Sequence, residues 1–254
     1  MCAGYYSYKS GHKPIFKGSE DFVGQIIHPQ EWNSTIDYEN KKVAVIGSGA
    51  TAVTLVPQIA KKASHVTMIQ RSPTYIASVP SKYKILHLLN YISPKFGYKI
   101  IRFTNILRQR RIYRRARRSP ELVKDYLLGL VRDELPDFDI EKHFTPSYNP
   151  WEQRLCLAPD SDFFESINQK KVSIETETID SFSEKGVQLD SGKLIEADII
   201  VTATGIKLQN FGGIRIFVDE NEIDISKSFI YKSMMYTQIP NFINTFGYIN
   251  ASVS

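Results

Sequence analysis

Apolar residues form a strand, helix and strand pattern between residues 41 and 71. Residues 43–46 are a short continuous apolar run, typical of a strand buried in a parallel sheet. A glycine-rich turn at 47–52 opens a helix, and a second apolar strand is predicted at 65–69. The helix contains Pro57, which costs about 3 kcal/mol in a helix interior, so we expect a kink or an early end there. The segment predicts a Rossmann-like α/β domain with a parallel sheet.

A run of helical patterns interrupts this domain between residues 76 and 150. Apolar residues recur at helical spacing over 84–90, 98–118 and 121–135. Serine-proline pairs separate the three segments. We therefore expect a helical insertion over 76–150 within the dinucleotide-binding domain.

The middle helix of this insertion is strongly basic over residues 102–118. Three explanations stay open: a solvated helix face, a weak contact with an anionic membrane surface, and a nucleic-acid patch. The solvated face is the default, and membrane contact comes second. Nucleic-acid binding comes last because no recognised binding motif accompanies the arginines, so we predict no nucleic-acid partner.

Strand patterns return after the insertion. Residues 144–156 are a proline-punctuated loop, a kind of segment that often carries function. Residues 172–194 alternate apolar and polar positions around two turns, which predicts a small antiparallel meander. Residues 199–205 predict a buried strand that ends in Ala-Thr-Gly. At the start of the chain, residues 1–6 look like the end of a buried strand with no preceding element to pair with it.

The turn at 47–52 has the G-x-G-x-x-A spacing of a dinucleotide-binding loop. Gly47 permits the tight turn, Gly49 lets the backbone approach a pyrophosphate, and Ala52 allows the helix to pack closely on the sheet. The phosphates would then contact free amides at the start of the helix. Glycine-rich loops also serve as plain turns, but the flanking strands and helix favour a nucleotide site. The predicted loop residues are Gly47, Ser48, Gly49, Ala50, Thr51 and Ala52.

The end of the second strand indicates which nucleotide binds. About 20 residues beyond the glycine loop, where the ribose is read, the chain has Gln70, Arg71 and Ser72 and no Asp or Glu. An acidic residue there would bind the ribose hydroxyls of NAD, whereas an arginine accommodates the extra phosphate of NADP. The sequence therefore favours NADPH, and the alternative is that Arg71 is a solvated charge at a strand end.

Composition narrows the class of protein. The chain has 254 residues, 42% of them hydrophobic and 23% charged, as in an ordinary soluble globular protein. The excess of cations behind its net charge of +5 is concentrated in the basic helix. With Cys2 and Cys156 as the two cysteines, we predict no disulfide framework and no metal site, and a reducing cytoplasm fits best. We expect a cytoplasmic protein without a membrane span or secretion signal, with peripheral membrane contact as the alternative.

A second motif precedes the glycine loop. It carries Phe22, Gly24, His28 and Trp32 in the spacing F-x-G-x-x-x-H-x-x-x-W. This segment resembles the fingerprint of Baeyer-Villiger and related FAD- and NADPH-dependent flavin-containing monooxygenases, and Asn33 departs from the Pro or Asp that usually follows. The resemblance extends over essentially the whole chain, to the subgroup of ethionamide-activating monooxygenases, through the strings GYYSY, HPQEW, GSGATAVTLVPQ, QRSPTY, PWEQRLC and TATG.

The resemblance implies a set of roles. FAD, reduced by NADPH, would use O2 to insert one oxygen atom into a ketone or to oxygenate a sulfur or nitrogen atom. Arg154 resembles an arginine that projects toward the flavin and would stabilise negative charge during oxygen transfer, although a structural salt bridge is the alternative from the residues alone. His28 and Trp32 would couple domain movement to the reaction cycle. Thr204 and Gly205 belong to the ATG motif that links the NADPH domain back to the flavin domain.

The resemblance also implies a domain organisation. Residues 1–36 would be the C-terminal part of the first FAD-domain segment, 37–171 the NADPH-binding domain, and 172–254 the meander, the ATG link and the return to an incomplete FAD domain. The family has two dinucleotide loops and one is found here, so we expect an internal piece of a longer enzyme. Two alternative functions stay open: an NADPH-binding module without oxygenase activity, and a basic interaction protein without a cofactor.

Overall fold

The computed structural model describes residues 4–82, 93–232 and 234–244. The chain forms two compact units, one made of Lys13–Gly205 and the other of Met1–His12 with Ile206–Ser254. The larger unit contains the glycine loop, the insertion and the fingerprint segment. The assignment of cofactor domains with boundaries at 36/37 and 171/172 stays a prediction.

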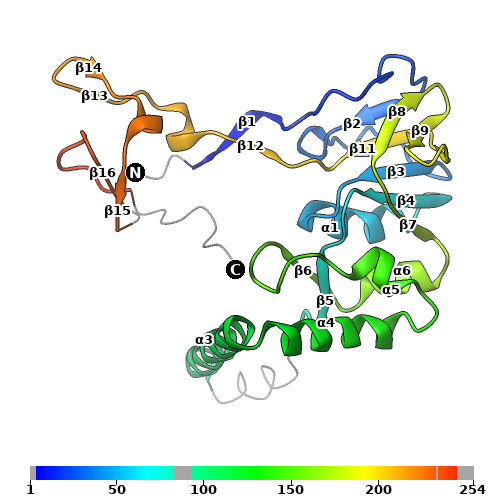
Figure 1. Cartoon of the computed structure of the whole chain (residues 1–254), viewed down its shortest axis with the longest axis horizontal. Coiled ribbons are helices and arrows are strands. Elements are labelled where there is room, and N and C mark those ends of the chain that lie inside the picture. The colour runs from blue at the N-terminus through cyan, green and yellow to red at the C-terminus, as the bar shows by residue number, and fades with distance from the viewer. Residues whose placement is uncertain (1–3, 83–92, 233, 245–254) are drawn as a thin grey trace. The chain divides into compact units, whose positions relative to one another are not determined.

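A five-stranded parallel sheet forms the centre of the larger unit (Figure 1). Its order is β2-β11-β3-β4-β7, and every neighbouring pair is parallel. The helix α1 (Ala50–Ile59) connects β3 to β4 and ends two residues after Pro57, which agrees with the expected early end. The predicted Rossmann-like α/β fold is confirmed. The strands of the sheet are β2 (Gln25–Ile27), β3 (Lys42–Ile46), β4 (His65–Gln70), β7 (Val172–Thr176) and β11 (Ile199–Thr202).

Alternate residues of the central strand β3 enter two different cores. Val43 and Val45 pack with the helices α1 and α6 (Asp162–Asn168) on one face. Ala44 and Ile46 pack on the other face with a three-stranded antiparallel sheet. Because both faces are covered, β3 reads as a continuous apolar run. The antiparallel strands are β8 (Ile179–Ser183), β9 (Gly186–Leu189) and β10 (Leu194–Glu196), in the order β10-β9-β8.

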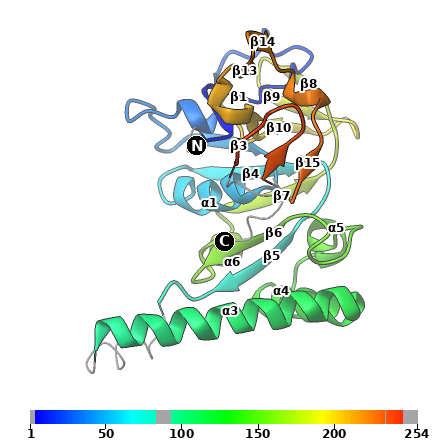
Figure 2. The same cartoon turned by 90° about the vertical axis from the view of Figure 1, so that its left-hand side faces the viewer.

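The insertion consists mainly of helices, and two of the predicted ones are confirmed. Both begin earlier than predicted, at Pro94 and Pro120, because proline suits the first position of a helix. Figure 2 shows α3 as the longest helix of the chain, and it packs on α4. The predicted helix over 84–90 lies outside the described residues. The helices of the insertion are α3 (Pro94–Arg118), α4 (Pro120–Glu134) and α5 (Ile140–Phe144).

Two strand assignments from the sequence were wrong. Residues 172–176 form β7, the edge of the parallel sheet, and do not belong to the antiparallel meander. An edge strand can alternate buried and partly exposed side chains, as Val172 and Ser173 do, so its pattern resembles that of a meander strand. A parallel pair, β5 (Tyr75–Val79) and β6 (Leu155–Pro159), also joins the two ends of the predicted insertion, where the sequence predicted no strand.

The smaller unit is built from short antiparallel pairs. β1 (Tyr6–Gly11) pairs with β12 (Ile206–Leu208). The expected buried strand end at residues 1–6 is wrong for the part described, because Tyr6 is 37% exposed and Gly4 is also exposed. Aromatic rings of Phe211, Tyr236 and Phe242 contact one another edge to face. The other elements are η2 (Asn210–Gly213), β13 (Phe217–Val218), β14 (Asn221–Glu222), η3 (Ile225–Lys227), β15 (Ile230–Tyr231) and β16 (Met235–Tyr236).

Candidate functional site

The glycine loop lies where β3 ends and α1 begins. Gly47 has a φ of +131° and donates its amide hydrogen to the carbonyl of Ile69 at 2.8 Å. A β-carbon at this position would collide with the carbonyl oxygen of Ala203. Gly47 is therefore required by the turn itself. Ser48 is buried, and Ala52 is fully buried where α1 packs on the sheet.

The start of α1 can accept an anion. Gly49 is its N-cap, in an extended conformation, and no side chain caps the helix. The first amides of a helix have no intrahelical acceptor and carry the positive end of the helix dipole. A β-carbon on Gly49 would meet one side chain, the Arg154 guanidinium, with Nη1 at 3.7 Å. The backbone here is open to a phosphate, and the exposed cation of Arg154 lies next to it. Ala50 and Thr51, the next two loop residues, are exposed.

Two hydroxyl groups hold the main chain of Arg154. The Tyr148 hydroxyl donates to the Arg154 carbonyl at 2.9 Å, and the Thr74 hydroxyl lies 3.3 Å from the same oxygen. Thr74 and Tyr148 are also 2.9 Å apart, oxygen to oxygen. The buried Tyr75 donates to the carbonyl of Tyr148 at 2.8 Å, and burial raises the pKa of Tyr75 to about 12, so this hydroxyl keeps its proton.

Sequence reasoning missed this support for Arg154. Thr74 and Tyr75 lie in the string QRSPTY, and Tyr148 lies in the proline-punctuated loop before β6. The pairing of β5 with β6 places Tyr75 opposite Leu155, next to Arg154. Since that pairing joins segments about 80 residues apart, no local pattern revealed it.

The residues at the carboxyl end of β4 differ in role: Gln70 is bound inside the protein, whereas Arg71 and Ser72 are exposed. The Gln70 side chain is buried and donates to the His143 carbonyl and to Thr176 Oγ1, both at 2.8 Å. Both amide hydrogens of Gln70 are thus used inside the protein, so a contact with a nucleotide would have to come from its oxygen or its main chain. Arg71 is exposed at the carboxyl end of the strand. Ser48 Oγ donates to the Ser72 carbonyl at 3.4 Å, which places residue 72 against the glycine loop.

His28 connects the fingerprint segment to the ATG motif. It is buried, and its Nε2 hydrogen is donated to the Gly205 carbonyl at 3.0 Å. The Gln30 amide donates to Nδ1 at 3.2 Å, so the ring is in the neutral tautomer with its proton on Nε2. Thr204 Oγ1 donates to the Thr202 carbonyl at 3.4 Å. His28 precedes the short helix η1 (Pro29–Glu31), and β2 lies beside β11 in the sheet.

Trp32 and Cys156 pack inside the larger unit. Trp32 lies against the main apolar core, with its ring edge to face with Tyr38 at 5.6 Å. Cys156 is buried on β6, with its sulfur 3.8 Å from the Ser48 carbonyl, and burial raises the pKa of its thiol. The structure thus places Cys156 directly behind the glycine loop, while Trp32 supports the core.

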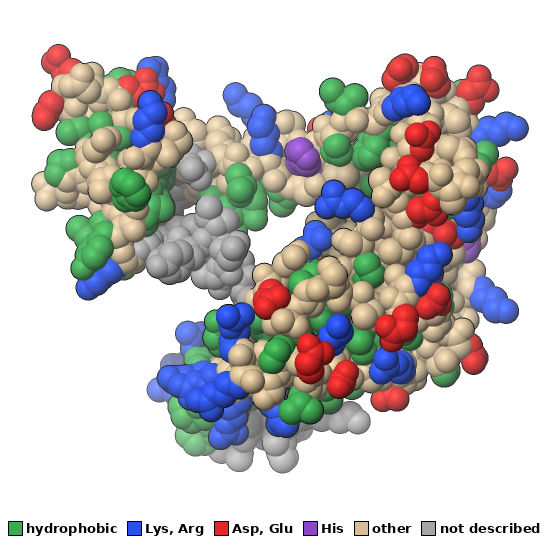
Figure 3. All heavy atoms as spheres, viewed as in Figure 1, with side chains coloured by type: hydrophobic (Ala, Val, Ile, Leu, Met, Phe, Trp, Pro, Cys, Tyr) green, Lys and Arg blue, Asp and Glu red, His purple; other side chains and the backbone are tan. Residues whose placement is uncertain are grey.

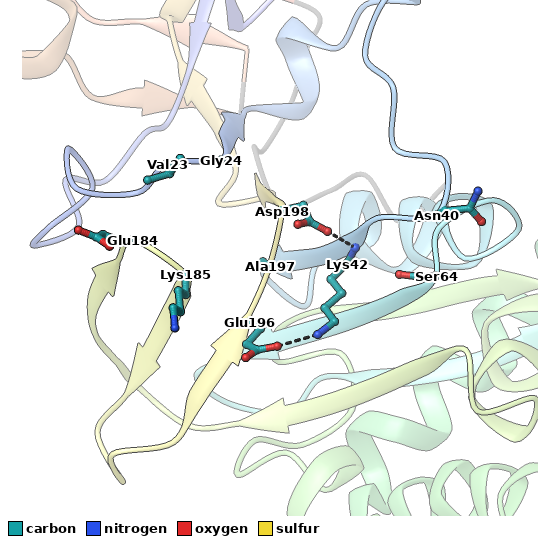
Figure 4. A pocket seen from close by; sticks show the side chains of 10 residues that line it. All are labelled: Val23, Gly24, Asn40, Lys42, Ser64, Glu184, Lys185, Glu196, Ala197 and Asp198. Carbon is teal, nitrogen blue, oxygen red and sulfur yellow. Dashed lines mark hydrogen bonds and ion pairs between the residues drawn. The ribbon is translucent and has the colours of Figure 1, made fainter.

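A concavity lies at the amino ends of the parallel strands, at the opposite end of the sheet from the glycine loop. Lys42 at the start of β3 pairs with Glu196 at 2.6 Å, and its amide donates to Asp198 at 2.7 Å (Figure 4). In parallel α/β sheets, ligands bind beyond the carboxyl ends of the strands. The Lys42 side chain is thus paired with Glu196 and the Asp198 carboxylate accepts from the main chain, and these groups take no part in the candidate site.

Nowhere in 4–82, 93–232 or 234–244 do three or more His, Cys, Asp or Glu side chains come together in a way that could hold a metal ion. In the same residues no helix is long and apolar enough to cross a membrane.

Comparison with known proteins adds the family. The sequence model described as flavin-binding monooxygenase-like matches residues 1–108. The FAD-containing monooxygenase EthA of Mycobacterium tuberculosis (strain ATCC 25618 / H37Rv) is 49% identical over 255 residues, which is 99% of this chain and 52% of that protein. This chain belongs to the flavin-containing monooxygenases. The family predicted from the sequence is confirmed.

Further relatives agree with this assignment. The probable FAD-binding monooxygenase AlmA of Acinetobacter baylyi is 48% identical over 253 residues, covering 99% of this chain and 51% of AlmA. The chain therefore spans about half the length of the curated relatives it matches.

Solved structures share the fold. The protein OTEMO, solved in complex with FAD and NADP, matches 82% of this chain and 47% of its own, with a TM-score of 0.62 and 19% identity. Cyclohexanone monooxygenase bound to ε-caprolactone matches 82% of this chain and 48% of its own, with a TM-score of 0.62 and 20% identity. At these identities the likeness establishes the fold.

Proposed function

We propose that this chain binds NADPH on the glycine loop and forms part of an FAD-dependent monooxygenase. The enzyme would use O2 to insert an oxygen atom into a ketone or to oxygenate a sulfur or nitrogen atom of a small molecule. The observation that carries the proposal is the open backbone at Gly49, with a helix start beneath it and the Arg154 guanidinium beside it. Relatives named as FAD-containing monooxygenases and a fold shared with a structure holding FAD and NADP support it.

In this proposal the loop residues hold the pyrophosphate. Amides from Gly49 to Ala52 face the phosphates, because the dipole of α1 and its uncapped amides favour an anion. Arg71 binds the 2′-phosphate from the carboxyl end of β4, and Ser72 lies against the loop through its contact with Ser48. When bound, NADPH supplies a hydride to FAD, and the reduced flavin activates O2.

Arg154 orients the reacting end of the nucleotide and stabilises negative charge that develops next to it. A guanidinium fixed before the reaction stabilises such charge without the cost of reorganisation. The two hydroxyls on the Arg154 carbonyl hold its main chain at a point from which the guanidinium reaches Gly49. By the family resemblance, Arg154 is also the residue of this chain that would face FAD, the second cofactor of the proposal.

We assign His28 a coupling role and Trp32 a supporting one. The hydrogen bond from His28 to Gly205 joins the two segments that the family resemblance places at the connections between the cofactor domains. A change in one connection would therefore be transmitted to the other. Trp32 keeps the fingerprint segment packed on the core.

The NADPH assignment is tested with Arg71→Ala. Loss of a charged hydrogen-bond partner costs about 1.5–3 kcal/mol, so the NADPH dissociation constant should rise roughly 10- to 150-fold. NADH lacks the 2′-phosphate, so its dissociation constant should stay the same. Lys61→Ala, at an exposed cation beyond the end of α1, is the matched control. Equal weakening of both nucleotides would remove Arg71 as the phosphate reader.

The alternative function is an NADPH-binding module without oxygenase activity of its own. Purified protein separates the two. Bound yellow flavin with NADPH-dependent O2 uptake supports the monooxygenase, whereas NADPH binding without flavin supports the module. A protein that binds neither cofactor would contradict both. The cytoplasmic location predicted from the sequence remains part of the proposal.

A further inference from the structure

The basic helix α3 is the largest feature of the chain to which NADPH binding assigns no role. Its charged residues are two lysines and eight arginines, without an aspartate or glutamate. Figure 3 shows Lys and Arg side chains gathered over this helix. In the part of the chain that the structure describes, no acidic side chain forms an ion pair with Arg110, Arg111 or Arg114. The charge of these three arginines is therefore not neutralised by an ion pair within the described residues.

The same helix exposes large apolar side chains. Phe96, Phe103 and Ile106 are 55%, 62% and 50% exposed, whereas Gly97 and Ala116 are buried. At about 100° per residue, the three exposed side chains lie within an arc of roughly 80°. The two buried residues lie roughly on the opposite side of the helix. The side of α3 that faces away from its packed side thus carries these three apolar side chains, here called the apolar stripe, together with Arg110 and Arg114 in the same arc.

We propose that α3 docks this protein on the surface of a membrane that contains anionic phospholipid. The helix would lie in the plane of the membrane, with Phe96, Phe103 and Ile106 at the acyl boundary and its arginines against the lipid phosphates. A surface helix gains affinity both from apolar burial and from the attraction of its cations to anionic headgroups. At a rise of about 1.5 Å per residue, the 25 residues of α3 give a contact about 37 Å long.

Other partners account for only half of these observations. Nucleic acid would neutralise the arginines but would leave Phe96, Phe103 and Ile106 in water. A second copy of the chain would cover the apolar stripe but would bring two strongly basic helices together, which like-charge repulsion opposes. An anionic membrane surface satisfies the charge and the apolar stripe together.

Vesicle sedimentation of the whole chain tests the proposal. Binding should be strong to phosphatidylcholine vesicles that contain phosphatidylglycerol, weak to phosphatidylcholine alone, and reduced by high salt, because salt screens exposed charges. Neutralising three arginines with Arg110→Gln, Arg111→Gln and Arg114→Gln should weaken binding about a hundredfold, since each cation near an anionic surface contributes roughly a fivefold factor. Phe103→Ser should weaken binding to both kinds of vesicle.

A matched control removes the same charge elsewhere. Lys61→Gln, Lys62→Gln and Lys171→Gln change three exposed cations outside α3 and should leave vesicle binding within about twofold of the original. Phe103→Trp gives a local readout, because its fluorescence should be quenched by brominated acyl chains. Absence of binding to anionic vesicles at low salt would overturn the proposal, as would equal losses in the two triple variants. Binding to an oligonucleotide without vesicle binding, or dimerisation that requires Phe103, would also overturn it.

Discussion

Replacing Gly47 by alanine separates the role of the turn from the role of the nucleotide. The φ of Gly47 is +131°, a conformation that residues with a side chain rarely adopt, and its amide is fixed by the bond to the Ile69 carbonyl. The added methyl group would collide with the Ala203 carbonyl, which belongs to the segment just after β11. Neither backbone can move without disturbing the ends of three neighbouring strands. Gly47→Ala should therefore destabilise the protein even without a ligand.

The size of the effect follows from the backbone alone. A residue held in such a sparsely populated region costs about 1–3 kcal/mol, before the overlap with Ala203 is added. For a unit of this size, each kcal/mol lowers the melting temperature by about 2–4 °C, so we expect a drop of at least roughly 2–12 °C. Circular dichroism during heating and in urea measures it. A Gly47→Ala protein within about 0.5 kcal/mol of the original would refute the reasoning.

Gly49→Ala is the matched control in the same loop. Gly49 has φ −80° and ψ 178°, which alanine adopts without strain, and its methyl group would lie in ordinary contact with Arg154. Replacing glycine at a compatible position tends to stabilise by about 0.4–1 kcal/mol, so stability should be unchanged or higher. The methyl group would occupy the approach of the pyrophosphate, and the NADPH dissociation constant should rise at least about tenfold, or ~1.4 kcal/mol. Unchanged NADPH binding in this variant would contradict the site.

Three further predictions concern groups around the loop. Burial lowers the pKa of His143 below its ordinary value of 6.5, so the unfolded chain binds the extra proton and stability falls as the pH drops below about 6.5. In the wild-type protein the urea concentration at the unfolding midpoint should fall between about pH 8 and about pH 5, and in His143→Gln it should fall less. An equal fall in both proteins would count against a role of His143 in this pH dependence. Burial raises the pKa of the Cys156 thiol and shields it from reagents. In a Cys2→Ser protein, iodoacetamide should therefore label Cys156 only as fast as the protein opens. Rapid labelling without urea would disprove the protection of this thiol. Tyr148→Phe keeps the ring contact with Tyr75 but removes the donor to the Arg154 carbonyl. In isothermal titration the NADPH dissociation constant of this variant should rise about 2- to 10-fold. An unaltered constant would mean that the hydroxyl does not position Arg154.

The local part of the fold was predictable from the sequence. The run at 43–46, the glycine turn and the strand at 65–69 have patterns that act over a few residues, and the structure forms β3, α1 and β4 there. The helices α3 and α4 were predictable for the same reason, apart from their proline starts. The long-range partners were not predictable, because β5 pairs with β6 across the whole insertion and β7 joins the sheet at its edge.

The parts of the site that could be predicted are those where the backbone requires a particular residue type, such as glycine. Gly47 and Gly49 were predicted from spacing, and the structure places them at the turn and at the helix start. Gln70 shows the limit of this reasoning, since its position at the strand end suggested a nucleotide contact while its side chain binds His143 and Thr176. The hydroxyls that hold Arg154 could not be found from the sequence, because serine, threonine and tyrosine hydroxyls are common and only a fold brings them to one carbonyl.

The ladder between β1 and β12 has a consequence for the order of folding. Gly11 and Ile206 are opposite each other in this ladder, although the whole larger unit separates them along the chain. Closing so long a loop carries an entropy cost that grows with its length, and a short, exposed ladder returns little free energy. We predict that β1 and β12 pair only after Lys13–Gly205 has folded and brought its two chain ends together. In pulsed hydrogen exchange during refolding, the amides of β3 and β4 should gain protection before those of β1; simultaneous protection would show that the ladder needs no such template.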